Sequence, residues 1–161
     1  MSKNWNATDM ENLLIERCVA KGLTVAVAES CTGGLLGASI TSAPGASAVF
    51  KGGIISYAND IKNRVLQVPT AVLESDGAVS KSCAEAMVRG ALKLFEVDLA
   101  AAVTGIAGPS GGTVDKPVGL VYIAVASADA IFSREFRFEG DRSEVRRQSV
   151  AQALSMLLQL I

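Results

Sequence analysis

The spacing of apolar residues along the chain follows two patterns, and each pattern predicts a different kind of element. Helical spacing, with apolar residues every three or four positions, predicts helices over 8–21, 33–42, 59–66, 80–95 and 141–160. Short apolar runs predict buried strands over 24–28, 53–57, 99–103 and 118–127, and alternation predicts a half-buried strand over 131–138. Helices interleaved with strands are typical of a three-layer α/β/α sandwich. Since the last two strands form a hairpin, we expect a mixed, mostly parallel sheet.

Length and composition favour one folded domain. The chain has 161 residues, 50% hydrophobic and 19% charged, which is enough for one core, so we expect a single domain over 1–161. Fifteen Lys and Arg against 16 Asp and Glu leave a net charge of −1, without the basic excess typical of nucleic-acid binding. We therefore expect no direct contact with nucleic acid. Segment 1–6 carries no signal-peptide core and the apolar runs are short, so we expect a cytoplasmic protein that does not enter a membrane.

The lack of histidine excludes more chemistry than any other count. It rules out a Ser–His–Asp triad, a Cys–His pair and any His-ligated metal. The three cysteines, Cys18, Cys31 and Cys83, are odd in number and are not spaced like metal ligands. We therefore expect no disulfide framework and no metal site. Acid–base chemistry has to come from Lys, Tyr, Asp, Glu or Cys, or from the substrate.

Segment 28–34, with the sequence AESCTGG, joins a predicted strand to a predicted helix. Free backbone N–H groups at a helix start bind anions and stabilise an oxyanion, and Ser30 stands where a nucleophile would use them. Ser30 also suits a helix N-cap, and the local pattern alone favours the N-cap over the nucleophile. Cys31 is a rival nucleophile, because a helix N-terminus lowers the pKa of a thiol. A buried Cys31 acting as a small hydrophobic residue is the simpler alternative.

Segment 56–62, with the sequence SYANDIK, follows the next predicted strand. A serine nucleophile needs a base, and a desolvated lysine can serve because burial lowers its pKa. Lys62 and Tyr57 lie beyond a strand end, where both could face Ser30. The alternative is that Lys62 is an ordinary solvated helix lysine. The chain has no S-x-x-K spacing, so a Ser–Lys pair has to form through the tertiary fold.

Two later segments have patterns that indicate ligand binding. The glycine-rich stretch 104–113 allows close backbone approach to a ligand, or it is a flexible loop. It is neither a Walker A motif nor a dinucleotide fingerprint, since no G-K-[ST] and no helix follow. Arg142, Arg146 and Arg147 crowd the start of the last helix, where the helix dipole disfavours cations, and this suits a phosphate. The alternative is pairing within the helix with Asp141 and Glu144.

Together these segments resemble the CinA C-terminal domain family of nicotinamide mononucleotide (NMN) deamidases. The matching stretches are AESCTGGL, GGIISYANDIK, VTGIAGPSGG, KPVGLVYIAV and GDRxxVR, from about residue 28 to the last helix. The resemblance implies a fold like the anticodon-binding domains of class II synthetases. It also implies hydrolysis of NMN to nicotinic acid mononucleotide and ammonia in pyridine-nucleotide salvage, without a cofactor, by a homo-oligomer. Many members carry a further N-terminal pyrophosphatase domain, which 161 residues leave no room for, so we expect no such activity.

The resemblance also implies roles for individual residues. Ser30 would be the nucleophile and Lys62 and Tyr57 its acid–base partners, while Arg142 or Arg146 would hold the 5′-phosphate. The remaining candidates for the oxyanion and the substrate are Cys31, Thr32, Gly33, Gly34, Thr104 and Gly105. One departure is Ser110, where the family loop usually has glycine. The alternative function is a non-catalytic module that binds a nucleotide, or a partner protein linked to competence or DNA damage.

Overall fold

The structure, a computed structural model, describes residues 7–161, so the expected absence of a signal peptide in 1–6 lies outside the described residues. The helices are α1 (Ala7–Lys21), α2 (Leu35–Ser42), α3 (Asn59–Leu66), α4 (Thr70–Ser75), α5 (Lys81–Phe95) and α6 (Arg142–Leu158), with a 3-10 turn at Ala46–Ala48. The strands are β1 (Val25–Glu29), β2 (Phe50–Ile55), β3 (Leu99–Gly105), β4 (Leu120–Ser127) and β5 (Ile131–Arg137). Among these described helices, none is long and apolar enough to span a membrane.

The described strands form one mixed sheet in the order β2-β1-β3-β4-β5. β1 pairs in parallel with β2 and β3, whereas β3–β4 and β4–β5 are antiparallel. The mixed sheet was expected, but its description as mostly parallel is wrong, because half of these pairings are antiparallel. The reason is that β3 returns directly into β4 through a loop, without the crossover helix that a parallel pair requires.

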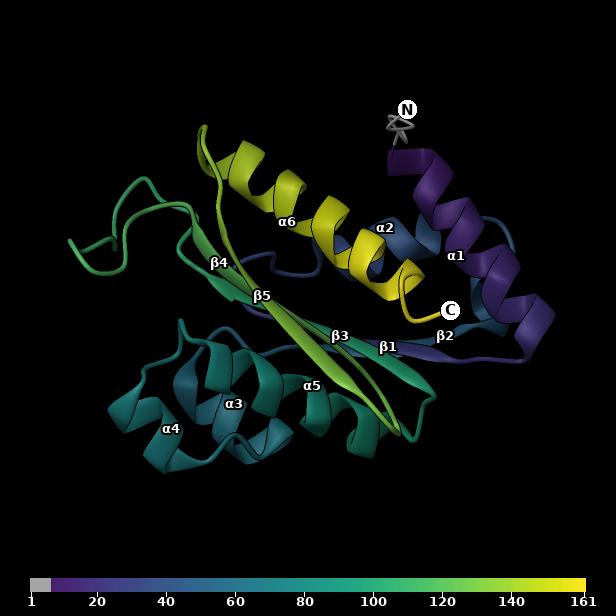
Figure 1. Cartoon of the computed structure of the whole chain (residues 1–161), viewed down its shortest axis with the longest axis horizontal. Helices are drawn as coiled ribbons and strands as arrows, with labels where there is room; N and C mark the ends of the chain where they lie inside the picture. The colour runs from purple at the N-terminus through teal and green to yellow at the C-terminus, as the bar shows by residue number, and fades with distance from the viewer. Residues whose placement is uncertain (1–6) are drawn as a thin grey trace.

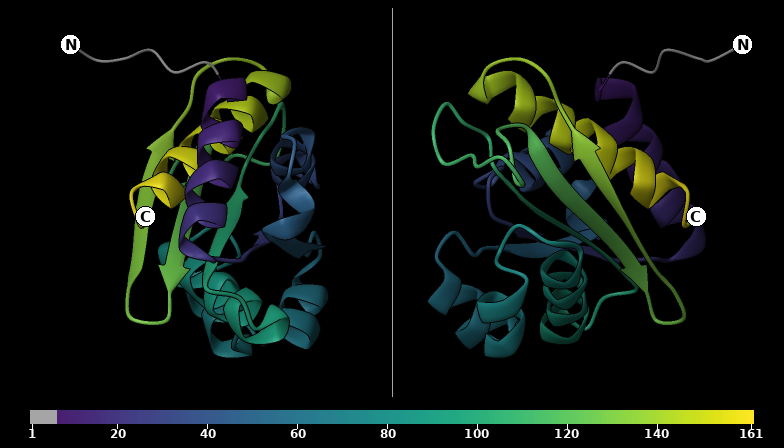
Figure 2. Two further views of the ribbon diagram at one scale, coloured as in Figure 1. Left: turned by 90° about the vertical axis from the view of Figure 1, so that its right-hand side faces the viewer. Right: turned by 60° about the vertical axis from the view of Figure 1, so that its left-hand side comes forward.

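Helices cover both faces of the sheet (Figures 1 and 2). α1, α2 and α6 lie on one face, over the larger side chains Val25, Val27, Val103 and Ile123. α3, α4 and α5 lie on the other face, which is rich in alanine on β3 and β4. Small side chains there let α5 approach closely. The likeness to anticodon-binding domains stays a prediction.

Most predicted elements appear with shifted ends. α2 begins at Leu35 rather than at residue 33, because Gly33 and Gly34 adopt left-handed conformations with φ of 57° and 101°. The strand predicted over 53–57 spans Phe50–Ile55, and α4 was not predicted at all. The last helix was predicted correctly at its start: Asp141 and Glu144 form a full capping box.

Candidate functional site

The carboxyl ends of β1, β2 and β3 meet at one edge of the sheet, and a cavity of about 260 Å³ opens there. Open α/β sheets bind ligands at such edges. The loop that joins β3 to β4 projects beyond the sheet on this side (Figure 1). The cavity is lined by Ser30, Cys31, Tyr57, Asn59, Lys62, Ala78, Val79, Thr104, Gly105, Ile106, Ala107, Gly108, Ser110, Gly111 and Arg142.

Ser30 and Lys62, which are 32 residues apart in the sequence, meet in this cavity. The Nζ of Lys62 lies 3.0 Å from the Oγ of Ser30 and also donates to the carbonyl oxygens of Ser56, at 2.6 Å, and Tyr57, at 3.2 Å. The side chain is not solvated, because only 1% of Lys62 is exposed. Burial lowers the pKa of Lys62 below its ordinary value of 10.5. A neutral amine at this position can accept the hydroxyl proton of Ser30.

Ser30 does not cap the helix that follows it, so the N-cap interpretation is wrong. The N-cap of α2 is Gly34, which has no side chain with which to cap the helix. The buried carboxylate of Glu29 instead accepts N–H bonds from Gly34 at 3.1 Å, Leu36 at 3.0 Å and Gly37 at 2.8 Å. Sequence reasoning missed this role of Glu29, although a carboxylate just before a helix start is a recognisable signal.

These contacts narrow the set of N–H groups that could stabilise an oxyanion. The Gly34 N–H is taken by Glu29, and the Gly33 N–H donates to the carbonyl of Ser30 at 3.1 Å. Thr32 is fully buried, and its hydroxyl has no partner among the described residues. These three residues do not line the cavity. Cys31 does, and within residues 7–161 its backbone N–H donates no hydrogen bond to another residue.

The thiol of Cys31 is a poor nucleophile in this structure. Burial raises its pKa from 9.0 to about 11, against smaller opposing effects of its own backbone and of Arg146 and Lys62. The structure therefore supports the alternative of a buried Cys31, which is 5% exposed, over the rival nucleophile with a lowered pKa. The thiol is protonated at neutral pH, which leaves the Ser30 hydroxyl as the better candidate.

The arginines at the start of α6 occupy different places. Arg142 lines the cavity and donates to the Gly108 carbonyl at 2.8 Å and to the Tyr57 hydroxyl at 3.1 Å. Arg146 instead donates to the carbonyl oxygens of Cys31 and Thr32. Pairing of these arginines with Asp141 or Glu144 was an alternative, but the structure has no such ion pair within the described residues. The two acids are engaged in the capping box.

Tyr57 lies at the mouth of the cavity, with 59% of its surface exposed. Its hydroxyl bonds to Arg142, while its backbone carbonyl accepts from Lys62. Within residues 7–161 the Tyr57 hydroxyl makes no hydrogen bond to Ser30. This geometry favours a direct proton transfer between Ser30 and Lys62 over one that passes through Tyr57.

The end of β3 and its loop form the opposite wall. The hydroxyl of Thr104 donates to the Ala78 carbonyl at 2.8 Å, so it faces the loop before α5. A Cβ on Gly105 would lie 2.7 Å from the Leu120 carbonyl oxygen, and this close approach requires glycine. Ser110 lies outside the left-handed region, so the loop accommodates its side chain, whereas Gly108 has φ of +84°.

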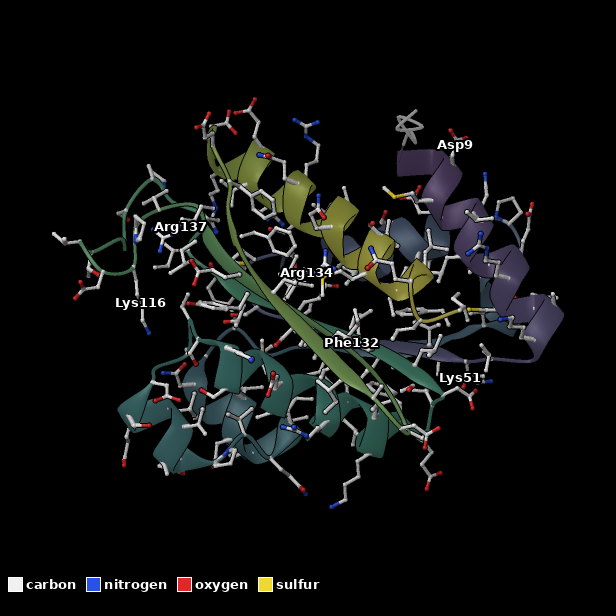
Figure 3. The ribbon with its side chains drawn as sticks, viewed as in Figure 1. Asp9, Lys51, Lys116, Phe132, Arg134 and Arg137 are labelled. Atoms are coloured by element: carbon white, nitrogen blue, oxygen red, sulfur yellow. The ribbon has the colours of Figure 1, made fainter. Side chains whose placement is uncertain are left out.

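The loop is also tied to the helix layer. Lys116 points from it toward α4 and α5 (Figure 3), and its Nζ donates to the Asp76 carbonyl at 2.5 Å.

The residues that sequence reasoning missed in the cavity are Asn59, Ala78, Val79, Ile106, Ala107, Gly108, Ser110 and Gly111. Asn59 and several loop residues stand inside the motifs quoted above, but Ala78 and Val79 follow α4 and carry no local signal. Lys62 and Arg142 are the charged residues of the described lining, and both are basic.

The comparisons with known proteins agree on one family. Residues 7–161 match the family model described as CinA C-terminal domain. A CinA-like protein from Geobacter sulfurreducens is 52% identical over 137 residues, which cover 85% of this chain and 33% of that protein. A putative competence-damage inducible protein from Caldicellulosiruptor saccharolyticus is 48% identical over 152 residues, covering 94% and 37%. The chain thus spans about a third of the length of these relatives.

Solved structures agree with this match. The crystal structure of a competence/damage inducible protein from Agrobacterium tumefaciens has a TM-score of 0.95 and 40% identity, and the match covers 99% of both chains. A competence-damaged protein (CinA) superfamily protein from Escherichia coli has a TM-score of 0.94 and 30% identity, with 100% of this chain and 94% of that chain covered.

Proposed function

This chain belongs to the CinA C-terminal domain family, and from that premise we propose that it is an amidohydrolase acting on NMN. Its products would be nicotinic acid mononucleotide and ammonia. One observation carries the proposal: the buried amine of Lys62 lies 3.0 Å from the hydroxyl of Ser30 at the end of β1. A nucleophile within hydrogen-bond reach of a base is the arrangement that acyl transfer requires.

The reaction would proceed in two halves. The neutral amine of Lys62 takes the proton of Ser30, and Oγ attacks the carboxamide carbon. The Cys31 N–H donates to the resulting oxyanion. The C–N bond then breaks, and Lys62 returns its proton to the leaving ammonia, which leaves an ester on Ser30. Water then attacks that ester while Lys62 takes a water proton, the C–O bond to Ser30 breaks, and Lys62 returns the proton to Oγ as the acid product leaves.

The rest of the cavity suits the other groups of NMN. Arg142 lines it with a guanidinium that can bind a phosphate with two parallel hydrogen bonds. Tyr57 lines the cavity with an exposed ring, and an aromatic ring attracts a cation such as a pyridinium. A positive ring near Lys62 would also disfavour the ammonium form of that side chain, which keeps the base neutral.

The experiment is ammonia release from NMN by the purified protein, with free nicotinamide as control substrate and Ser30→Ala as control variant. We expect release from NMN only, and none from Ser30→Ala with its circular dichroism spectrum unchanged. Near-wild-type turnover by Ser30→Ala would refute the serine mechanism. No release by the folded wild-type protein would refute the deamidase proposal and favour the binding module.

A further inference from the structure

The contacts of Arg146 bear on the serine turn, which we define as residues 30–34. Its Nε donates to the Cys31 carbonyl at 3.2 Å and its Nη2 to the Thr32 carbonyl at 2.9 Å. Arg146 does not line the cavity, and within residues 7–161 no carboxylate forms an ion pair with it. The guanidinium therefore bonds to two successive peptide groups of one turn.

Planar peptide groups connect these bonds to the nucleophile. In a trans peptide the carbonyl and the following N–H point in opposite directions. Arg146 holds the Thr32 carbonyl, so the Gly33 N–H points away from Arg146, and it donates to the Ser30 carbonyl at 3.1 Å. That bond in turn orients the Cys31 N–H in the direction opposite to the Ser30 carbonyl.

The N–H of the residue after a serine nucleophile is a known position for an oxyanion donor. We propose that Arg146 is a positioning residue that holds the serine turn so that Ser30 Oγ and the Cys31 N–H act on the same carbonyl group. This inference rests on the proposed function, since it takes Ser30 as the nucleophile. Arg146 therefore serves turn geometry, while Arg142, one helical turn earlier, serves the substrate.

Arginine is suited to this role and lysine is not. The planar guanidinium presents several donors in a rigid fork, so one side chain can hold two neighbouring carbonyl oxygens in fixed directions. A lysine ammonium is a single flexible point charge and would hold the two peptides less firmly. We therefore expect Arg146→Lys to keep the charge of the native chain and still lose part of the catalytic rate.

The first experiment compares Arg146→Gln with Arg147→Gln. Arg147 is exposed on the same helix, so its substitution removes the same charge from a position outside the site. We expect kcat for NMN to fall on the order of 10²-fold in Arg146→Gln, with KM changed by less than about twofold. Arg147→Gln should keep both constants. A raised KM with wild-type kcat would overturn the proposal and make Arg146 a substrate ligand.

The second readout does not depend on NMN. A fluorophosphonate phosphonylates the Oγ of Ser30 with loss of fluoride, and its P=O group uses the same oxyanion donor. We expect labelling to slow in Arg146→Gln and guanidinium ion to restore part of the rate in Arg146→Ala. Unchanged labelling in folded Arg146→Gln would overturn the positioning role. Labelling that depends on Arg146 without ammonia release by the wild type would overturn only the NMN assignment.

The conservative variant Arg146→Lys tests the proposal if the other two Arg146 variants fail to fold. If circular dichroism shows that Arg146→Gln and Arg146→Ala do not fold, Arg146→Lys decides the question. We expect that variant to have a native spectrum, a reduced kcat and slower labelling. Wild-type values of both rates in Arg146→Lys would overturn the proposal.

Discussion

Replacing Lys62 with methionine tests whether the fold holds this amine with a lowered pKa. Methionine keeps the length and apolar stem of the side chain and removes the titrating group. Burial lowers the Lys62 pKa in the folded protein below 10.5. Between the folded pKa and 10.5, the unfolded chain binds a proton at Lys62 that the folded chain does not bind. The free energy of unfolding therefore rises with pH over this window.

The pH dependence of the unfolding free energy is set by the one proton that Lys62 binds on unfolding. Its slope approaches about 1.4 kcal/mol per pH unit where the folded amine is neutral and the unfolded amine is charged. Cys18, Cys31 and Cys83 act with the opposite sign above pH 9.0, because burial raises the pKa of each thiol to about 11. The charge of Lys62 itself lowers the pKa of Cys31 and Cys83 slightly. The difference between wild type and Lys62→Met therefore isolates Lys62 below pH 9.0, where the thiols stay protonated in both states.

The assay is urea unfolding followed by circular dichroism from about pH 6 to about pH 9. We expect the wild-type curve to gain stability relative to Lys62→Met as pH rises. We also expect kcat to rise with pH up to the folded pKa of Lys62 and to level off above it, since the neutral amine is the base. Lys51→Met, at an exposed position on β2, is the matched control and should keep the wild-type slope. Parallel stability curves for wild type and Lys62→Met would refute the reasoning.

Four further substitutions test other parts of the structure. Cys31→Ala should keep most of the deamidase activity, because that thiol is protonated at neutral pH. Loss of the activity in a turnover assay would instead identify Cys31 as the nucleophile. Arg142→Ala should raise KM for NMN with little change in kcat, since phosphate binding is largely uniform, and an unchanged KM would contradict this. Glu29→Gln should lower the unfolding free energy by about 1.5–3 kcal/mol in urea titrations, because it weakens three N–H bonds at α2. Gly90→Ala should destabilise the fold in a thermal melt, because its Cβ would lie 2.1 Å from the Leu66 carbonyl oxygen, and a wild-type Tm would contradict this close contact.

Much of the local structure could be predicted because it depends on neighbours in the chain. The capping box of Asp141 and Glu144 needs residues three positions apart, and both contacts are present. The helix 59–66 was predicted with the bounds that α3 has. One local contact was missed: the side chain of Glu29, the residue before Ser30, bonds to N–H groups up to eight residues later and takes the helix start that Ser30 was expected to cap.

The sequence by itself determined the order of the helices and strands other than α4, the lack of imidazole chemistry and a short set of candidate residues, because period and composition act locally. Only the tertiary structure decided that Lys62 is buried and within 3.0 Å of Ser30. It also decided that Arg142 lines the cavity while Arg146 bonds to the serine turn. The physical reason is that the burial, pKa and orientation of these side chains depend on groups from distant parts of the chain. A local sequence pattern spans only a few residues, so it carries no information about such contacts.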